Sequence, residues 1–283
     1  MIQIEYKIRK REGQLFYSFF EYNQKNEKVS QVLFKNNRKI MYKTFYENGM
    51  LKSRVSFLND KKHGLYKYYY PNGIIKISIP YRFHKIHGTI KYYNNKGEID
   101  IKSSYKNGVK NGTTIHYNSK GEPVIIKMFR NNKLHGKVIL KSNFFYSVIH
   151  YKEGKKQGKE KNYIIDLHEK KKLYSIINYK DNYREGNTIF FNQDEKIVMI
   201  IPFRKNKIHG YKRIYNEDGS IKERIHYREG NPIYHFLKLV KEKECSVCYE
   251  FVLTQTKCKH ILCKSCYEKL VHKHCPLCRS CLF

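Results

Sequence analysis

The sequence predicts a mainly β protein in two parts, an elongated array of β-hairpin repeats over residues 1–232 and a small cysteine-rich domain over residues 245–283. Two observations carry this prediction. All eight cysteines lie at or after Cys245. Before that point, glycines recur at intervals close to 24 residues, at Gly64, Gly88, Gly112, Gly136, Gly158, Gly186 and Gly210.

A fixed interval of this length indicates a repeat architecture. Several units have a second glycine nine residues after the first, namely Gly73, Gly97, Gly121 and Gly219. Two turns per period imply two strands per period. Since a two-strand unit cannot bury an apolar face alone, we expect neighbouring units to stack into a long twisted sheet. The 28-residue interval from Gly158 to Gly186 predicts one lengthened loop around residues 168–172.

Aromatic residues keep a fixed phase with the glycines. One lies seven residues before most of them, at Phe57, Tyr81, Tyr105, Phe129, Tyr151, Tyr179 and Phe203. Alternation along the strands, as in Ile75, Ile77 and Ile79 against Lys76, predicts one apolar face and one wet, basic face. We therefore expect the aromatic residues to pack in a core. Stacking of nucleic-acid bases on them is the alternative.

Histidines precede four of the glycines, at His63, His87, His135 and His209. A column of metal ligands is one interpretation. Polar turn residues are the simpler one, because Asn111, Gln157 and Glu185 occupy the same position in other units.

Short motifs recur in the array: Tyr105-Lys106-Asn107-Gly108, Lys133-Leu134-His135-Gly136, Lys207-Ile208-His209-Gly210 and Tyr68-Tyr69-Tyr70-Pro71-Asn72-Gly73. In these motifs, roughly from Tyr42 to Gly230, the chain resembles MORN-type repeats. The resemblance implies scaffolding, protein contact or binding of anionic phospholipid, and no enzymatic activity.

The net charge is +32, of which residues 245–283 contribute only +4. The strongly basic array favours an acidic partner, either nucleic acid, anionic lipid or an acidic protein surface. A solvated lysine-rich surface is the alternative. Ile197–Phe203, the longest apolar run, is too short for a membrane helix, so we expect no transmembrane segment. Cysteines confined to one block favour a reducing compartment, cytoplasmic or nuclear.

Residues 233–244 predict a short helical linker or cap. Ile233, Phe236, Leu237 and Val240 fall at helical spacing after Pro232. Such a helix would cover the last repeat or contact the cysteine-rich domain.

The cysteine-rich domain contains four close pairs of potential metal ligands: Cys245 and Cys248, Cys258 and His260, Cys263 and Cys266, and Cys275 and Cys278. A close pair directs two side chains at one ion, and two pairs complete a tetrahedral zinc site. The eight ligands therefore predict two structural zinc ions. Cys281, His272 and His274 could substitute in another pairing, but the spacing is satisfied without them.

In this order of ligands the domain resembles a RING finger of the type with three cysteines, one histidine and four cysteines. The resemblance implies a small α+β cross-brace fold, in which Cys245, Cys248, Cys263 and Cys266 bind one zinc ion and Cys258, His260, Cys275 and Cys278 bind the other. It also implies ubiquitin ligase activity, with a ubiquitin-conjugating enzyme and ubiquitin as partners. Val247, Leu270 and Pro276 would form the groove for the enzyme.

By the same resemblance Arg279 would be the cation that positions ubiquitin for transfer, without covalent chemistry. Alternatively, the three apolar residues pack the small domain and Arg279 is ordinary surface charge. The expected function is therefore that of a RING-type ubiquitin-protein ligase whose repeat array recruits an unknown substrate or an anionic surface. The alternatives are a non-catalytic zinc-binding adaptor, and a repeat protein that binds anionic lipid or nucleic acid.

Overall fold

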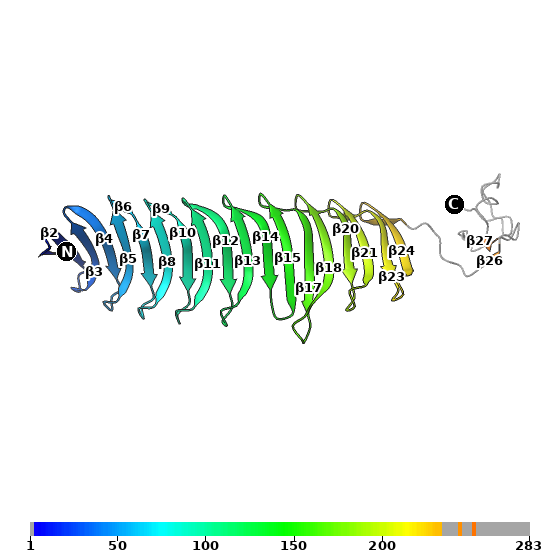
Figure 1. The fold of residues 1–283 in the computed structure, drawn as a ribbon, viewed down its shortest axis with the longest axis horizontal. Helices are drawn as coiled ribbons and strands as arrows, with labels where there is room; N and C mark the ends of the chain where they lie inside the picture. The colour runs from blue at the N-terminus through cyan, green and yellow to red at the C-terminus, as the bar shows by residue number, and fades with distance from the viewer. Residues whose placement is uncertain (1–2, 234–242, 245–250, 253–283) are drawn as a thin grey trace.

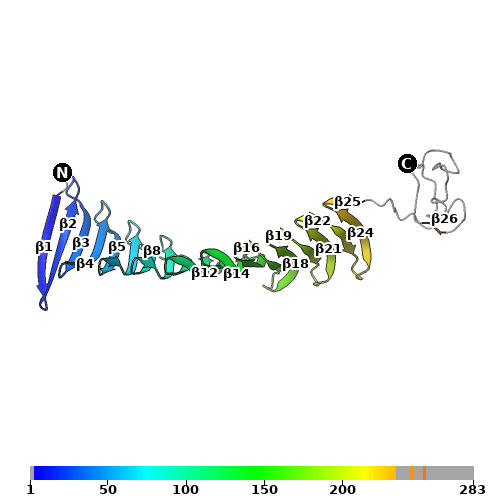
Figure 2. The ribbon, with the colours of Figure 1, turned by 90° about the horizontal axis from the view of Figure 1, so that it is seen from above.

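The computed structural model describes residues 3–233, 243–244 and 251–252. Strands β1 to β25 form one antiparallel sheet in which strands follow each other in chain order (Figure 1). The sheet is long, one layer thick and bent along its length (Figure 2). The predicted mainly β, elongated hairpin array is confirmed.

The sheet opens with β1 (Gln3–Arg11), β2 (Gln14–Tyr22), β3 (Lys28–Lys35) and β4 (Arg38–Phe45). The strands that then run into successive tight turns are β5 (Leu51–Leu58), β8 (Ile75–Arg82), β11 (Ile99–Lys106), β13 (Pro123–Arg130), β15 (Phe145–Lys152), β18 (Lys171–Lys180), β21 (Ile197–Arg204) and β24 (Ile221–Arg228). The strands that leave the turns are β6 (Lys61–Lys62) with β7 (Gly64–Tyr69), β9 (Lys85–Ile86) with β10 (Gly88–Tyr93), β12 (Val109–Tyr117), β14 (Lys133–Lys141), β16 (Lys155–Lys156) with β17 (Gly158–Ile165), β19 (Tyr183–Arg184) with β20 (Gly186–Phe191), β22 (Lys207–Ile208) with β23 (Gly210–Tyr215), and β25 (Asn231–Ile233).

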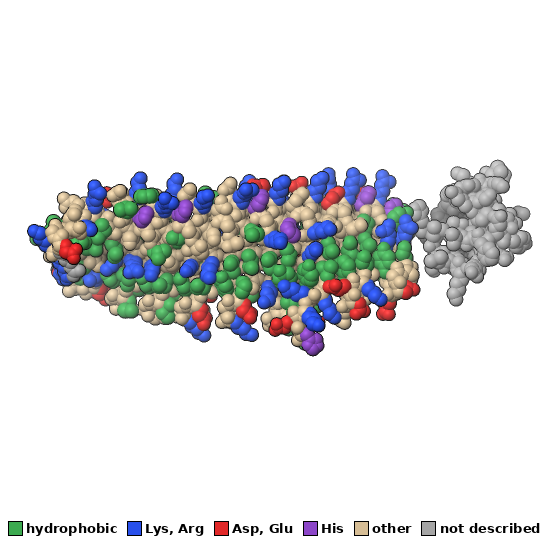
Figure 3. All heavy atoms as spheres, in the orientation of Figure 1, with side chains coloured by type: hydrophobic (Ala, Val, Ile, Leu, Met, Phe, Trp, Pro, Cys, Tyr) green, Lys and Arg blue, Asp and Glu red, His purple; other side chains and the backbone are tan. Residues whose placement is uncertain are grey.

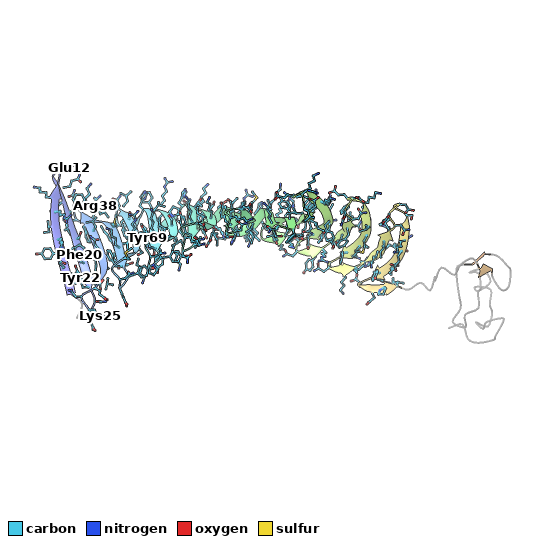
Figure 4. The ribbon with its side chains drawn as sticks, turned by 90° about the horizontal axis from the view of Figure 1, so that it is seen from below. Glu12, Phe20, Tyr22, Lys25, Arg38 and Tyr69 are labelled. Carbon is cyan, nitrogen blue, oxygen red and sulfur yellow. The ribbon has the colours of Figure 1, made fainter. Side chains whose placement is uncertain are left out.

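The two long edges of the sheet differ. One carries two-residue turns with positive φ at both central residues, such as Asn131 (49°) and Asn132 (65°), the geometry that matches strand twist. The other carries longer loops, in which Asn94 Oδ1 accepts hydrogen bonds from the N–H groups of Lys96 and Glu98, both at 3.0 Å. Figure 4 shows Glu12 in a tight turn and Lys25 in a loop at these opposite edges.

Each tight turn is bonded to the hairpin before it. The Asn132 N–H donates to the Lys110 carbonyl at 2.9 Å, and the Lys110 N–H donates to Asn132 Oδ1 at 2.8 Å. Asn182 and Lys156 repeat the arrangement, as do Asn206 and Arg184. The prediction that neighbouring units stack is thus confirmed, and turn asparagines are part of the reason.

The 28-residue interval does not lengthen a loop, so that prediction is wrong. Asp166 Oδ1 accepts hydrogen bonds from the N–H groups of His168 and Lys170, as Asn94 does in an ordinary unit. The extra residues instead extend the two strands, β17 to 8 residues and β18 to 10. This hairpin protrudes at the loop edge in Figure 1.

The predicted packed core is also wrong in form, because no second layer covers the sheet among the described residues. The buried apolar side chains in that part of the chain are few: Phe20, Val55, Ile90, Val138 and Ile149. Buried polar side chains pair across strands instead. Ser147 Oγ donates to Asn162 Oδ1 at 2.7 Å, and Asn162 Nδ2 donates to Ser175 Oγ at 3.1 Å. A single layer leaves both faces partly exposed, so lateral contacts within each face replace a core.

The prediction of a helical linker over residues 233–244 falls mostly on residues 234–242, which lie outside the described residues. At its two ends, Ile233 belongs to β25, and Lys243–Glu244 form strand β26, which pairs with β27 (Phe251–Val252). Over residues 3–233 and the two short strands beyond them, the structure has no helix of the length and apolarity that a membrane span requires.

Candidate functional site

The predicted zinc ligands lie outside the described residues: Cys245, Cys248, Cys258, His260, Cys263, Cys266, Cys275 and Cys278. So do the predicted partner-binding residues Val247, Leu270 and Pro276, and Arg279. The described strands β26 and β27 flank the first ligand pair in sequence, with Glu244 opposite Phe251.

One face of the sheet carries rows of cations; it is here called the basic face and is defined by Lys76, Ser78, Pro80 and Arg82 of β8. Its central row can be followed through the strand register from β4 to β11. The residues directly opposite one another are Lys43, Arg54, Lys67, Ser78, Lys91 and Lys102. Like charges directly opposite across strands repel each other. A surface that repeats this arrangement suits an anionic partner, which would relieve the repulsion.

The central row then changes character. From β12 to β21 it is mainly aliphatic, with Ile115, Ile126, Ile139, Val148, Lys161, Ile176, Ile189 and Ile200. Arg213 and Arg224 end it. The expectation of a basic face therefore holds for the central row from β4 to β11 and again at β23 and β24, and is wrong for the central row from β12 to β21. Figure 3 shows hydrophobic side chains as a band along the middle of the molecule.

A second basic row on the same face follows the tight turns. A residue pair closes each turn, and on the strand that enters the turn it lies four residues after the central row, or about 13 Å along the strand. Five of these pairs hold two cations: Lys35 and Arg38, Arg82 and Lys85, Arg130 and Lys133, Lys152 and Lys155, and Arg204 and Lys207. Figure 3 shows a row of Lys and Arg along the upper edge of the view, the edge of the tight turns.

The opposite face, here called the aromatic face, is defined by Ile75, Ile77, Ile79 and Tyr81. The predicted aromatic residues form a row on it. Six of the seven lie directly opposite a glycine of the neighbouring strand, as Tyr81 does to Gly64 and Phe129 to Gly112, whereas Phe57 faces β4, which has no glycine. Gly64 and Gly112 have positive φ, 83° and 99°, a conformation that favours glycine, so local backbone geometry and strand register together keep the two residues in fixed phase.

Cations of one hairpin cover the rings of the next. Lys39 Nζ lies 4.5 Å from the ring centroid of Phe57, and Lys110 Nζ lies 4.3 Å from that of Phe129. Lys156 covers Tyr179 at 4.6 Å, and the Arg184 guanidinium covers Phe203 at 5.3 Å. Such contacts are worth about 0.5–1 kcal/mol each at exposed sites. They link successive repeats.

Two lysines of this ladder have opposite electrostatic surroundings. Burial, with the nearby charge of Lys127, lowers the pKa of Lys110 below its ordinary value. Burial alone would also lower the pKa of Lys156, but a hydrogen bond to Glu160 at 2.9 Å and the attraction of its carboxylate raise it instead. Lys110 and Lys156 thus occupy the same position in their repeats, but only the charge of Lys156 is stabilised by an ion pair with a carboxylate.

The residues before the glycines reach the next tight turn. His87 Nδ1 is 3.0 Å from Asn107 Oδ1, and His135 Nδ1 is 3.0 Å from Glu153 Oε1. Gln157 Oε1 accepts from the Asp181 N–H at 3.0 Å. The interpretation as turn residues agrees with these contacts. In residues 3–233 and the two short strands beyond, no group of three or more potential ligands could hold a metal ion.

The array therefore offers binding surfaces: two rows of cations and a partly exposed aliphatic row. Its central row was missed from the sequence, because Lys43, Arg54, Lys67, Lys91 and Lys102 align only once the register is known. Their unequal spacings along the chain reflect alternating short turns and longer loops.

Comparison with known families bears on the array alone. Four segments match the MORN repeat variant. They are residues 41–59, 62–82, 86–107 and 208–229. The last three begin just after one tight turn and end at the next, so the MORN unit corresponds to two strands around one loop. The sequence resemblance to MORN repeats is confirmed at these places, and no RING match accompanies it.

No curated protein matches the chain. Among solved structures, the chain is similar to a porin-like protein from Bacteroides uniformis, with 7% identity over 82% of this chain and 91% of the other, and a TM-score of 0.18. A similarity at that level supports no conclusion about this protein.

Proposed function

We propose that the chain is a RING-type ubiquitin-protein ligase in which residues 245–283 recruit a ubiquitin-conjugating enzyme and the array recruits the substrate. The observation that carries the proposal is the complete ligand order from Cys245 to Cys278, followed directly by a cation at Arg279. The pairing of β26 with β27 around the first ligand pair supports it.

Two zinc ions would be structural in this proposal. Four protein ligands fill each tetrahedron and leave no open position, so the metal supplies folding energy rather than a reactive centre. Zinc binding would then supply on the order of 10 kcal/mol of folding free energy per site to a domain that is too small to be stable without it. Val247, Leu270 and Pro276 would bind the conjugating enzyme, and Arg279 would hold ubiquitin in a reactive pose by hydrogen bonds.

The array supports a second role, recruitment to an anionic surface. The rows of Lys and Arg on the basic face favour it, because repeated cation pairs lower their mutual repulsion by binding a polyanion. In that case location, rather than direct contact alone, would select the substrate.

Ubiquitin transfer by the purified full chain tests the proposal. With ubiquitin, activating enzyme and a panel of conjugating enzymes, we expect autoubiquitination that requires zinc. The Arg279→Ala variant should retain its zinc and its binding of the conjugating enzyme, while transfer falls at least tenfold because the ubiquitin is no longer held in place.

Lys273→Ala is a matched control, since it removes one cation from the same block at a position that is neither a predicted zinc ligand nor a predicted partner-binding residue. It should transfer ubiquitin like the unmodified chain. A folded, zinc-loaded chain that makes no conjugates with any enzyme of the panel contradicts ligase activity and leaves the non-catalytic adaptor.

A further inference from the structure

The first strand is an unprotected edge of the sheet. Over the described residues, β1 pairs with β2 on one side and with no strand on the other. It is nine residues long and exposes Ile4 at 70%, Tyr6 at 68% and Ile8 at 61%. A long edge strand with exposed apolar side chains on one face and free backbone donors and acceptors is a template for pairing with another strand.

At the other end of the sheet, the described part of β25 includes Pro232, which has no N–H to donate. No proline interrupts β1, so its whole length can pair with another strand.

We propose that β1 pairs antiparallel with β1 of a second copy of this chain, centred on Tyr6. In this register Tyr6 lies opposite Tyr6 of the second copy, and Ile4 lies opposite Ile8. Glu5 lies opposite Lys7 of the second copy, and Lys7 opposite its Glu5. Both apolar faces then continue as one face, and the strand buries its exposed side chains against its own copy.

Charge selects this register over its neighbours. A shift by one residue would place apolar residues opposite charged ones, because side chains alternate between faces. A shift by two residues keeps the faces aligned, but it places Glu5 opposite Glu5 in one direction and Lys7 opposite Lys7 in the other. Only the register centred on Tyr6 makes every charged pair at positions 5 and 7 complementary.

Glu5 is already held for such a contact. The Tyr22 hydroxyl donates to it at 2.8 Å, and Lys7 Nζ lies 3.2 Å away. The hydrogen bond from Tyr22 and the neighbouring Lys7 lower the pKa of Glu5, so the side chain stays ionised near neutral pH.

The arrangement closes at two copies. Both chains use the same edge, as in a twofold interface, so pairing of the two β1 strands leaves neither β1 edge free for further growth. Joining the arrays end to end also keeps their basic rows apart, whereas side-by-side packing of such basic molecules would bring them together.

The mass of the full zinc-loaded chain in solution tests the proposal, by sedimentation equilibrium at micromolar concentration. We expect twice the 34.2 kDa chain mass. Glu5→Lys and Lys7→Glu should each be monomeric, because each places like charges opposite. The double variant E5K/K7E should be dimeric again, and an equimolar mixture of the two single variants should form a mixed dimer.

Glu12→Lys makes the same charge change in the tight turn and should leave the dimer intact. A monomeric wild type, single variants that remain dimeric, a double variant or mixture that stays monomeric, or a mass that grows without limit would each overturn the proposal. The inference does not depend on the proposed ligase activity, and its readout is mass rather than ubiquitin transfer.

Discussion

Lys110 and Lys156 occupy equivalent positions in the array yet differ in what holds their charge. Lys110 has an aromatic ring as its partner, and burial opposes its charge. Lys156 also covers a ring but is paired with Glu160, whose side chain is only 12% exposed. The difference gives a matched test of which interaction stabilises the array.

Substitution of each lysine by methionine should separate the two effects. Lys110→Met should change the free energy of unfolding by no more than about 1 kcal/mol, because relief of the buried charge offsets the lost ring contact. Lys156→Met should lower it by about 2 kcal/mol, since it leaves the Glu160 carboxylate without its partner. Urea unfolding measures both, and equal effects would contradict the assignment.

The pH dependence of these effects should differ in sign. The folded-state pKa of Lys156 is raised, so its stabilisation is present below the unfolded value of 10.5 and is lost as pH rises through the folded pKa. For Lys110 the folded pKa is lowered, so the cost of its charge diminishes as pH rises through that pKa. The difference in free energy of unfolding between Lys156→Met and the unmodified chain should therefore become smaller in strong alkali. No such decrease is expected for Lys110→Met.

For single residues, the sequence predicts which ones repeat but not what each one contacts. The seven-residue offset between aromatic residue and glycine is visible in the chain. That Tyr81 lies over the glycine of the preceding hairpin needs the register, because Gly64 and Tyr81 are 17 positions apart. The ion pair of Lys156 and Glu160 is equally specific to one repeat.

The elements were predictable where turn chemistry marks them. Paired glycines and asparagines identify two turns per period, and the strands fall between them. The hairpin of β17 and β18 could not be derived, because four added residues fit equally well into a loop or into two strands. That Ile233 belongs to β25 was missed, because an apolar residue directly after Pro232 suits the start of a helix as well as a strand.

The central row of the basic face carries a prediction about strands acting together. A variant with Arg54→Gln, Lys67→Gln and Lys91→Gln should bind vesicles containing phosphatidylserine about a hundredfold less tightly at low salt, at about 1 kcal/mol per lost cation. Its stability should not fall, because opposed like charges are removed. Vesicle sedimentation over a salt series measures the binding.

The matched control removes three cations from the loop edge: Lys96→Gln, Lys120→Gln and Lys196→Gln. It has the same net charge but leaves the central row intact, so it should bind nearly as tightly as the unmodified array. Equal losses in the two variants would mean that net charge, and not the row, attracts the anion. Binding that salt does not weaken would contradict an electrostatic surface altogether.

The molecule as a whole is a one-layer array followed in sequence by a block of metal ligands. Its length and repeat were predictable from the 24-residue interval. The absence of a second layer over the described residues was not, because apolar alternation suits an exposed face stiffened by lateral contacts as well as a covered one. The switch of the central row from Lys102 to Ile115 depends on register and could not be read from composition.

The claim at the centre of this account is that Cys245 to Cys278 bind two zinc ions as one folding unit. Native mass spectrometry of the purified full chain measures the zinc content directly. We predict two zinc ions per chain, unchanged in Cys281→Ser and reduced in Cys278→Ser, because only Cys278 belongs to the ligand set. A folded chain with no zinc or one zinc ion, or equal loss in the two variants, would contradict the claim.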